Sequence, residues 1–261
     1  MFWSRRRSRG RKAPLPFSPA WIAILKRNVP YYRSLSSAER AELQRLTQDF
    51  IAQKNFEGAG RLEMTDEIRV TIAAQACLLL LGRETRLYPE LQSVIVYPEA
   101  YVAPDLTEWP EGTVSEGLEE RAGESWSQGA VVLSWDEVLE SSRDPGDGYN
   151  VVLHEFAHQL DEETGDANGI PVLPEDSMIA EWARVFTRQY EALVRRVERG
   201  RRAFLDEYAA ESPAEFFAVV TEYFFEVPGG LRARHPDLYR LLQAYYAQDP
   251  AARMNPAARG R

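Results

Sequence analysis

The sequence contains very few cysteines and histidines, the residues that form disulfides or bind transition metals through sulfur and nitrogen. Cys77 is its only cysteine, and there are three histidines among 261 residues. A single cysteine forms no intrachain disulfide, and it excludes a zinc site built from several thiolates. The lack of disulfides suits a reducing compartment, so we predict a cytoplasmic location.

Long hydrophobic runs are also missing. The apolar stretch around Cys77, residues 70–82, is too short for a transmembrane helix, which needs about 20 residues. We therefore expect a helix buried in the core and no membrane span. Residues 14–27 contain three prolines and end in charge, so no signal peptide is predicted.

The net charge of −9 is unevenly distributed along the chain. Six basic residues and no acid lie in the first twelve positions, which leaves 25 basic against 40 acidic residues in the remainder. This acidic body argues against direct nucleic-acid binding, since phosphate contacts need clustered basic residues on the fold. Residues 1–13 are predicted to be a disordered basic tail, with contact to anionic lipid or RNA as the alternative. A second short tail is expected over residues 256–261.

Residues 14–255 show no internal repeat and no linker, and we predict one α+β domain that is mostly helical with a small sheet. Strand-forming composition occurs near the middle, in residues 91–102 and 129–135. The acidic stretch 105–124 is expected to be a loop or a hairpin. Capping residues and apolar spacing predict helices over residues 36–53, 65–81, 135–144, 150–161, 177–199 and 212–227.

Two of the three histidines lie in VVLHEFAHQLDEETG, residues 151–165. His154 and His158 are four residues apart, so they share a helical face and both imidazoles can reach one metal ion. The carboxylate of Glu155 is placed to accept a proton from a metal-activated water. Such spacing also arises by chance on solvated helices, but the apolar flanks predict a buried helix, where polar groups need partners. The pattern therefore predicts a metal site, with the small sheet beside this helix.

A catalytic zinc site takes three protein ligands, so the third must come from another part of the chain. No histidine follows at the spacing of the extended HExxH motif, and His235 is predicted to be a surface residue. Glu215 and Glu222 are seven residues apart and share a helical face, whereas Glu211 precedes that helix. The alternative for Glu215 is a capping role, because SPAE, residues 212–215, has the form of a capping box. The residues alone favour Glu215 over Glu222 and exclude neither.

Two further predictions concern the surroundings of the metal. Asp161, one turn after His158, is a candidate to orient a ligand imidazole, and a solvated acid near the helix end is the alternative. The strand over residues 129–135 is a candidate sheet edge, to which an extended substrate would add through backbone hydrogen bonds; burial as an inner strand is the alternative. The predicted substrate-binding residues on it are Gly129, Ala130, Val131 and Val132.

Three motifs occur in order along the chain: GESWSQGAVVLSW (123–135), HEFAHQLD (154–161) and YAAESPAEFFAVVTEYFFE (208–226). With these motifs the sequence resembles the Mlc titration factor A family of zinc-dependent peptidases over most of its length. The resemblance implies a zincin-like metallopeptidase domain whose active site is similar to that of the anthrax lethal factor protease domain.

The resemblance also implies roles for single residues. One zinc ion would be held by His154, His158 and the family's glutamate ligand, which falls on Glu215, with Glu155 as the catalytic base. A family tyrosine that helps to stabilise the oxyanion matches Tyr208. Without the resemblance, Tyr208 would be interpreted as a packed aromatic residue at a helix boundary.

Two functions are predicted on this basis. The first is a zinc peptidase that acts on peptide or protein substrates, for which the family implies short, aminopeptidase-type substrates. The second is an interaction protein that binds and sequesters a transcriptional repressor of the Mlc type, with catalysis secondary. Glu155 favours the first, because a purely structural zinc site has no use for a base. A metal-free helical protein is a third interpretation, which metal analysis would test.

Overall fold

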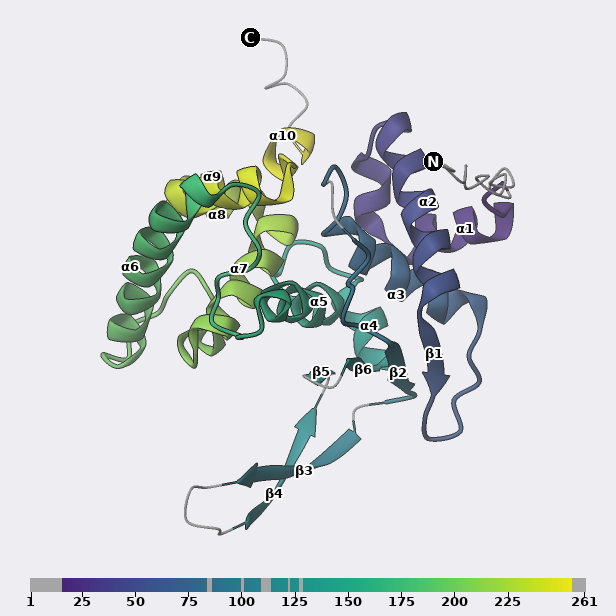
Figure 1. Ribbon diagram of the computed structural model, residues 1–261, viewed down its shortest axis with the longest axis horizontal. Coiled ribbons are helices and arrows are strands. Elements are labelled where there is room, and N and C mark those ends of the chain that lie inside the picture. Colours follow the sequence, from purple (N-terminus) through teal and green to yellow (C-terminus); the bar gives the residue numbers. More distant parts are fainter. Residues whose placement is uncertain are drawn as a thin grey trace, which may run out of the picture.

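The computed structural model describes residues 16–83, 86–99, 101–108, 114–121, 123–126 and 129–254. The predicted tails, residues 1–13 and 256–261, lie outside this part of the chain. The described residues form helices around a small sheet, which confirms the predicted α+β fold (Figure 1). None of the described helices is both long enough and apolar enough to cross a membrane.

Four of the described helices begin at residues where the sequence predicts a helix start. Ser36 caps α2 in a complete capping box, Thr65 caps α3, Asn150 caps α5 and Ser212 caps α7. The predicted helix over residues 65–81 ends earlier, at Leu78, and turns lead from there to residue 83. The helices are α1 (Pro19–Asn28), α2 (Ser37–Gln53), α3 (Asp66–Leu78), α4 (Trp135–Ser141), α5 (Val151–Asp161), α6 (Ile179–Val197), α7 (Pro213–Glu226), α8 (Pro228–Arg234), α9 (Pro236–Tyr246) and α10 (Pro250–Met254). Short 3-10 turns are η1 (Pro30–Ser34), η2 (Glu162–Thr164), η3 (Asp176–Met178) and η4 (Glu207–Ala210).

The main sheet has the strand order β1-β2-β6-β5. Strands β1, β2 and β6 are parallel, and β5 pairs antiparallel with β6. A separate antiparallel hairpin, β3–β4, extends away from the helices in Figure 1 and accounts for much of the acidic stretch predicted to be a loop or a hairpin. The strands are β1 (Asn55–Gly58), β2 (Ser93–Tyr97), β3 (Tyr101–Glu108), β4 (Val114–Arg121), β5 (Gly123–Trp126) and β6 (Ala130–Ser134).

The prediction that residues 129–135 form a sheet edge is wrong. β6 pairs with β2 on one side and with β5 on the other, so its backbone hydrogen bonds are used in both directions. Val131 and Val132 are 0% and 2% exposed. In the described sheet, the edge beyond β6 belongs to β5, and a peptide could add there but not to β6.

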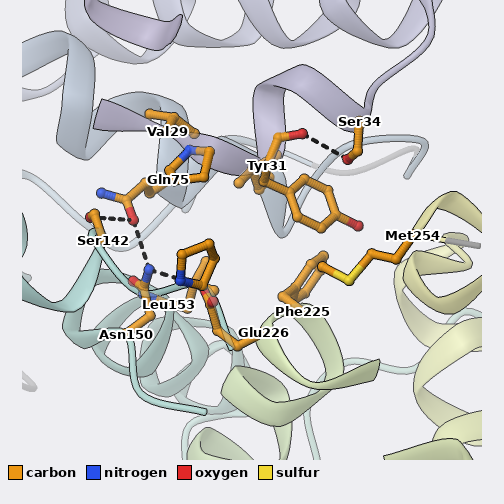
Figure 2. Close-up of a pocket in the computed structure, with 13 residues that line it drawn as sticks. Val29, Tyr31, Ser34, Gln75, Ser142, Asn150, Leu153, Phe225, Glu226 and Met254 are labelled. Atoms are coloured by element: carbon orange, nitrogen blue, oxygen red, sulfur yellow. Dashed lines mark hydrogen bonds between the residues drawn. The ribbon is translucent and has the colours of Figure 1, made fainter. Parts of the chain in front are cut away.

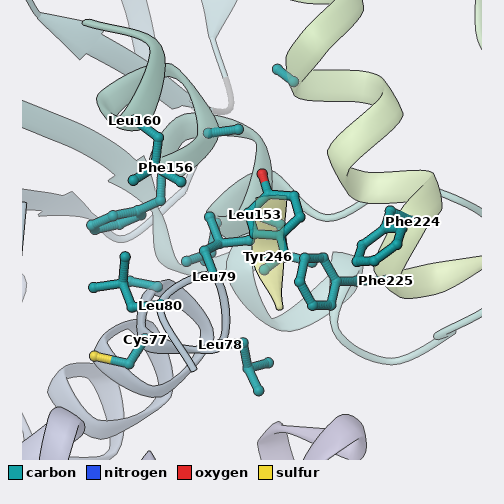
Figure 3. Packing of buried hydrophobic residues seen from close by; sticks show 14 of the residues in the cluster. Cys77, Leu78, Leu79, Leu80, Leu153, Phe156, Leu160, Phe224, Phe225 and Tyr246 are labelled. Carbon is teal, nitrogen blue, oxygen red and sulfur yellow. The ribbon is translucent and has the colours of Figure 1, made fainter. Parts of the chain in front are cut away.

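The core lies where α3, α5 and α7 pack together, and Figure 3 shows its centre. Leu153 and Phe156 of α5 face this core, and α5 also contacts β5 and β6 of the sheet. Cys77 is fully buried on α3, as predicted for that apolar stretch. Phe156 is fully buried, so truncation to alanine would cost about 3–5 kcal/mol of unfolding free energy. This packing fixes the positions of α5 and α7 relative to each other, and both helices carry residues of the predicted metal site.

Candidate metal centre

The candidate metal centre is built on α5, a helix that is buried along nearly its whole length. Its N-cap is Asn150, whose side-chain oxygen accepts a hydrogen bond from the backbone N–H of Leu153 at 3.0 Å. The amide nitrogen of Asn150 donates to Gln75 on α3 and to Glu226 on α7, at 2.8 and 3.3 Å (Figure 2). The start of α5 is therefore tied to both neighbouring helices.

Three side chains from α5 and α7 converge on one point. The Nε2 atoms of His154 and His158 are 3.1 Å apart. Glu215 Oε2 lies 3.0 Å from Nε2 of His154 and 3.4 Å from Nε2 of His158. Among the described residues, these three form a group whose ligand atoms are close enough together to hold one metal ion.

The spacing and the protonation pattern both fit a tetrahedral metal ion. Two ligand atoms about 2.1 Å from a tetrahedral zinc lie roughly 3.4 Å apart, close to the three observed separations. When Nδ1 of His154 donates to Glu222 Oε1, which lies 2.7 Å away, a neutral His154 has a lone pair on Nε2 that can bind a metal ion. Lone pairs that face each other in a buried site repel unless a cation lies between them. The donor set of two imidazoles and a carboxylate suits zinc.

The electrostatics of the cluster also favour a cation. Burial alone would raise the pKa of Glu215, but hydrogen bonds with His154 and His158 outweigh it and lower that pKa to about 2. Burial alone would lower the pKa of His154, yet Glu215 and Glu222 raise it well above its usual value. The same carboxylates that would hold a proton on His154 would hold a metal ion in its place.

Glu155 lies beside this cluster and is 6% exposed. Its burial raises the pKa of its carboxyl to about 7, although the two nearby histidines oppose the shift. A carboxyl group with a pKa near neutrality can both accept and release a proton at pH 7. Glu155 is thus a buried carboxyl group close enough to His154 and His158 for their charges to act on it.

Glu215 does not close the capping box that its sequence permits. Ser212 Oγ accepts a hydrogen bond from the backbone N–H of Glu215 at 3.1 Å, which caps α7. The Glu215 carboxylate is directed to the histidines of α5 rather than back to the N-cap. The alternative of a purely capping glutamate is thus excluded by where its side chain lies.

Glu222, the second candidate ligand, lies on the far side of the His154 ring. One carboxylate oxygen accepts from His154 Nδ1, and the other accepts from the backbone N–H of Asn150 at 2.6 Å. Glu222 is 2% exposed and its carboxylate is not part of the converging group. It orients a ligand imidazole, as the carboxylate partners of metal-bound histidines do.

Asp161 does not have the partner that we predicted. One of its carboxylate oxygens accepts from the backbone N–H of Gly169 at 2.7 Å, and the other has no hydrogen-bond partner among the described residues. Gly169 has a positive φ of 77°, and a Cβ there would lie 2.5 Å from the carbonyl oxygen of Pro213. Asp161 therefore holds a glycine turn against the start of α7, and hydrogen bonding to a ligand imidazole falls to Glu222.

Tyr208 lies beside the cluster, on η4. Asp206 accepts a hydrogen bond from the backbone N–H of Tyr208 at 2.9 Å and so fixes this turn. The Tyr208 ring is 5.9 Å from the His154 ring, and its hydroxyl interacts with Glu215. Burial, with the negative charge of Glu215, raises the pKa of Tyr208, so its hydroxyl keeps its proton and can donate it in a hydrogen bond. The ring is 46% exposed and thus accessible from solvent.

The remaining predicted residues lie apart from the cluster. His235 is half-buried between α8 and α9, where its Nδ1 contacts Gln189 at 3.1 Å and its ring stacks on Phe204. Gly129 and Ala130 lead into the inner strand β6, and the Gly129 carbonyl accepts two backbone hydrogen bonds. Sequence reasoning placed the start of α5 at Asn150 but missed the hydrogen bonds from its side chain to Gln75 and Glu226.

A helix with two histidines four residues apart, a glutamate beside the first and a carboxylate from a later helix is the arrangement found in HExxH metallopeptidases. The chain matches the family model "Glucose-regulated metallo-peptidase M90" over residues 2–247, and it belongs to that family.

Individual relatives agree with this assignment. An uncharacterized protein of Synechocystis is 40% identical over 237 residues, which cover 90% of this chain and 86% of the relative. Mlc titration factor A of Pectobacterium atrosepticum is 36% identical over 239 residues, which cover 90% and 88%. Mlc titration factor A of Klebsiella pneumoniae is 33% identical over 228 residues, which cover 86% and 85%.

Proposed function

We propose that this protein is a zinc-dependent peptidase that hydrolyses short peptides, including aminopeptidase-type substrates, with Glu155 as general base. The observation that carries the proposal is the convergence of His154, His158 and Glu215 with Glu155 next to them. A site used only to stabilise the fold would have no need of a buried carboxyl group poised for proton transfer.

The chain's own residues suffice for the proton transfers of peptide hydrolysis. A bound zinc ion would lower the pKa of a water molecule to about 7 and polarise the scissile carbonyl group. Glu155 then takes the water proton and passes it to the leaving amine. The Tyr208 hydroxyl donates a hydrogen bond to the carbonyl oxygen as that oxygen gains negative charge. No covalent intermediate with the protein is required.

The substrate would lie along β5, the edge strand next to β6. An extended peptide can add to such an edge through backbone hydrogen bonds. β5 packs against α5, the helix that carries the histidines. In this proposal Val131 and Val132 support the sheet from inside, and they do not touch the peptide.

The first test is zinc per chain, with peptidase activity measured beside it on a panel of short fluorogenic peptides. We expect one zinc in the wild type and in Glu155→Gln, with activity reduced about 10²–10⁴-fold in the variant because the base is lost. Glu211→Gln removes an exposed carboxylate just before α7 and serves as the control. Its zinc content and its activity should be unchanged. A metal-free wild type under zinc-loading conditions would refute the proposal.

A second candidate function is binding of a transcriptional repressor, because several relatives are named Mlc titration factor A. If repressor binding is independent of catalysis, Glu155→Gln should bind an Mlc-type repressor as tightly as the wild type does. Loss of binding in Glu155→Gln alone would instead connect binding to the active centre. For this role, as for the peptidase, we keep the prediction of a cytoplasmic location.

A further inference from the structure

A large cavity lies outside the candidate metal centre, between the C-terminal half of α6, the segment over residues 201–206 and the junction of α8 with α9. It has a volume of about 610 Å³ and is lined by Arg196, Arg202 and Arg234, together with Phe204 and His235. Arg199, just after α6, and Arg201 and Arg232 in the other two segments are exposed. We call these six arginines the arginine cluster.

The members of the arginine cluster form no ion pair with a described residue, as is also true of some other arginines such as Arg33 and Arg143. Eight other described arginines each have a carboxylate within 4.0 Å. Among the described residues, no carboxylate lies within that distance of any member of the cluster. The chain has 40 acidic and 31 basic residues, so the missing ion pairs do not come from a shortage of acids.

Two guanidinium groups of the cluster are held in place on the cavity wall. Arg196 Nε donates to the carbonyl oxygen of Arg202 at 2.5 Å, which leaves its two terminal nitrogens for another partner. The Arg234 guanidinium lies over the Phe204 ring, 4.5 Å from its centroid, and His235 stacks on the same ring. Fixed, planar guanidinium groups bind carboxylate groups well, because they lose little side-chain entropy and offer paired donors.

The size and the guanidinium lining of the site favour an acidic peptide over a small anion. A cavity of this volume is far larger than a phosphate ion and lies in the range of sites for extended ligands. Arg234 and His235 both pack on the Phe204 ring, which reduces the area that it offers for a nucleobase to stack on.

The cavity lies next to the candidate active site along the chain. Residues 201–206 line it and run without interruption into η4, which carries Tyr208. Arg202 and Tyr208 are six positions apart in the chain, a span of at most about 20 Å. An extended peptide covers that distance in roughly six residues.

We propose that the arginine cluster is a recognition site for acidic segments of peptide substrates, at positions several residues from the bond that is cleaved. The role as a substrate site rests on the proposed peptidase function. The binding of an acidic peptide to the arginine cluster does not depend on the peptidase function, and it is measured separately.

The test uses two fluorescent peptides that differ only in a terminal run of four glutamates or four glutamines. Binding to the full-length Glu155→Gln protein is followed by fluorescence anisotropy. We expect the glutamate peptide to bind about tenfold more tightly at low salt, since several ion pairs each add a fraction of a kcal/mol, and we expect salt to reduce the difference. Arg202→Gln/Arg234→Gln in this protein should abolish the preference.

Arg45→Gln/Arg184→Gln is the matched control, because it removes the same charge from exposed ion pairs elsewhere and should leave the preference intact. Equal binding of the two peptides, or a preference that survives Arg202→Gln/Arg234→Gln, overturns the proposal. So does displacement of the glutamate peptide by an equal concentration of inorganic phosphate, or tighter binding of a single-stranded oligonucleotide of equal charge.

Cleavage of the same peptides by the wild-type enzyme separates the two proposals. We expect the glutamate run to lower KM about tenfold and to leave kcat unchanged, because the site adds binding energy far from the reacting bond. If neither peptide is cleaved but the anisotropy preference holds, the peptidase function fails and the acidic-peptide site stands. If both are cleaved with equal KM, the peptidase function stands and the substrate role of the arginine cluster fails.

Discussion

Two helices of this protein begin with the same pattern, a serine followed three residues later by a glutamate. At the start of α2, Glu39 accepts a hydrogen bond from the backbone N–H of Ser36 at 2.8 Å and closes the capping box. At the start of α7, Ser212 caps the helix in the same way, but the Glu215 carboxylate turns to His154 and His158 instead. The two helix starts have equivalent local sequences, and the neighbouring part of the structure determines what each glutamate binds.

The difference shows how an ordinary structural motif can supply a metal ligand. The N3 position of a capping box places a carboxylate at the first turn of a helix, where its backbone is already held. In α2 the nearest outside partner is Arg253, which pairs with Glu39 and adds to the fold. In α7 the nearest outside partners are two imidazoles, so the same carboxylate completes a candidate metal centre.

The largest expected effect distinguishes the two glutamates by metal content. Glu215→Ala should lose the bound zinc, because two imidazoles alone make an incomplete site. Glu39→Ala should retain one zinc per chain. Elemental analysis of the purified proteins measures both. A Glu215→Ala protein that keeps full zinc would break the comparison and return Glu222 to consideration as the ligand.

The next effect concerns Tyr208, whose hydroxyl contacts Glu215 and has no counterpart at the start of α2. Tyr208→Phe should lower kcat about 10²–10³-fold, the usual loss on removal of one oxyanion donor, with zinc content unchanged. Steady-state kinetics on a short fluorogenic peptide measure the loss. Tyr190→Phe removes a hydroxyl that bonds to the carbonyl of Ala210 and serves as control. An unchanged kcat would remove Tyr208 from the proposed mechanism.

A smaller effect is expected for Glu222, which orients His154 without joining the converging group. Glu222→Gln should weaken zinc binding about 10–100-fold, because partners of ligand histidines typically contribute that much. Competition with a chelator gives the affinity. Loss as complete as that of Glu215→Ala would mean that the two glutamates of α7 have the same role.

The smallest effect concerns Glu39 in the capping box of α2, and it is an effect on the unfolding free energy. Partial burial opposes ionisation of Glu39, but hydrogen bonds from Ser36 and Arg253 lower its pKa from 4.5 to about 2. Ionised Glu39 therefore stabilises the fold above pH 4.5, and this contribution is lost as the pH falls toward 2. Glu39→Gln should lower the unfolding free energy by roughly 0.3–1.5 kcal/mol at neutral pH, and by less as the pH falls.

Urea unfolding of the zinc-free proteins at several pH values measures the difference in unfolding free energy between wild type and Glu39→Gln. Glu140→Gln, which changes an exposed glutamate of α4, is the control and should show little difference from the wild type at any pH. A gap between wild type and Glu39→Gln that grows on acidification would contradict the assigned pKa shift.

Much of the fold could be predicted because its signals are local. Capping residues gave the starts of α2, α3, α5 and α7, and apolar spacing gave their extent. The spacing of His154 and His158 placed both imidazoles on one helical face, where the structure has them. These features depend on residues at most a few positions apart, which a sequence displays directly.

The features that could not be predicted depend on pairing between distant segments. Nothing within GAVVLSW indicates that β5 would cover the outer side of β6, so the edge was assigned to the wrong strand. Glu215 and Glu222 are equivalent on a helical wheel, and only the position of α5 decides which one meets Nε2 and which one meets Nδ1 of His154. Asp161 was misassigned for the same reason, since its partner Gly169 lies in a turn.

The separation of the metal-binding residues along the chain has a consequence for biosynthesis. His154 and His158 leave the ribosome with α5, whereas Glu215 follows only with α7, after the whole of α6 has been made. A nascent chain that ends before α7 carries the HExxH motif without its third ligand. If the protein is a peptidase, it is therefore inactive during most of its own translation, and its activity begins only when nearly all of the chain has been released to fold.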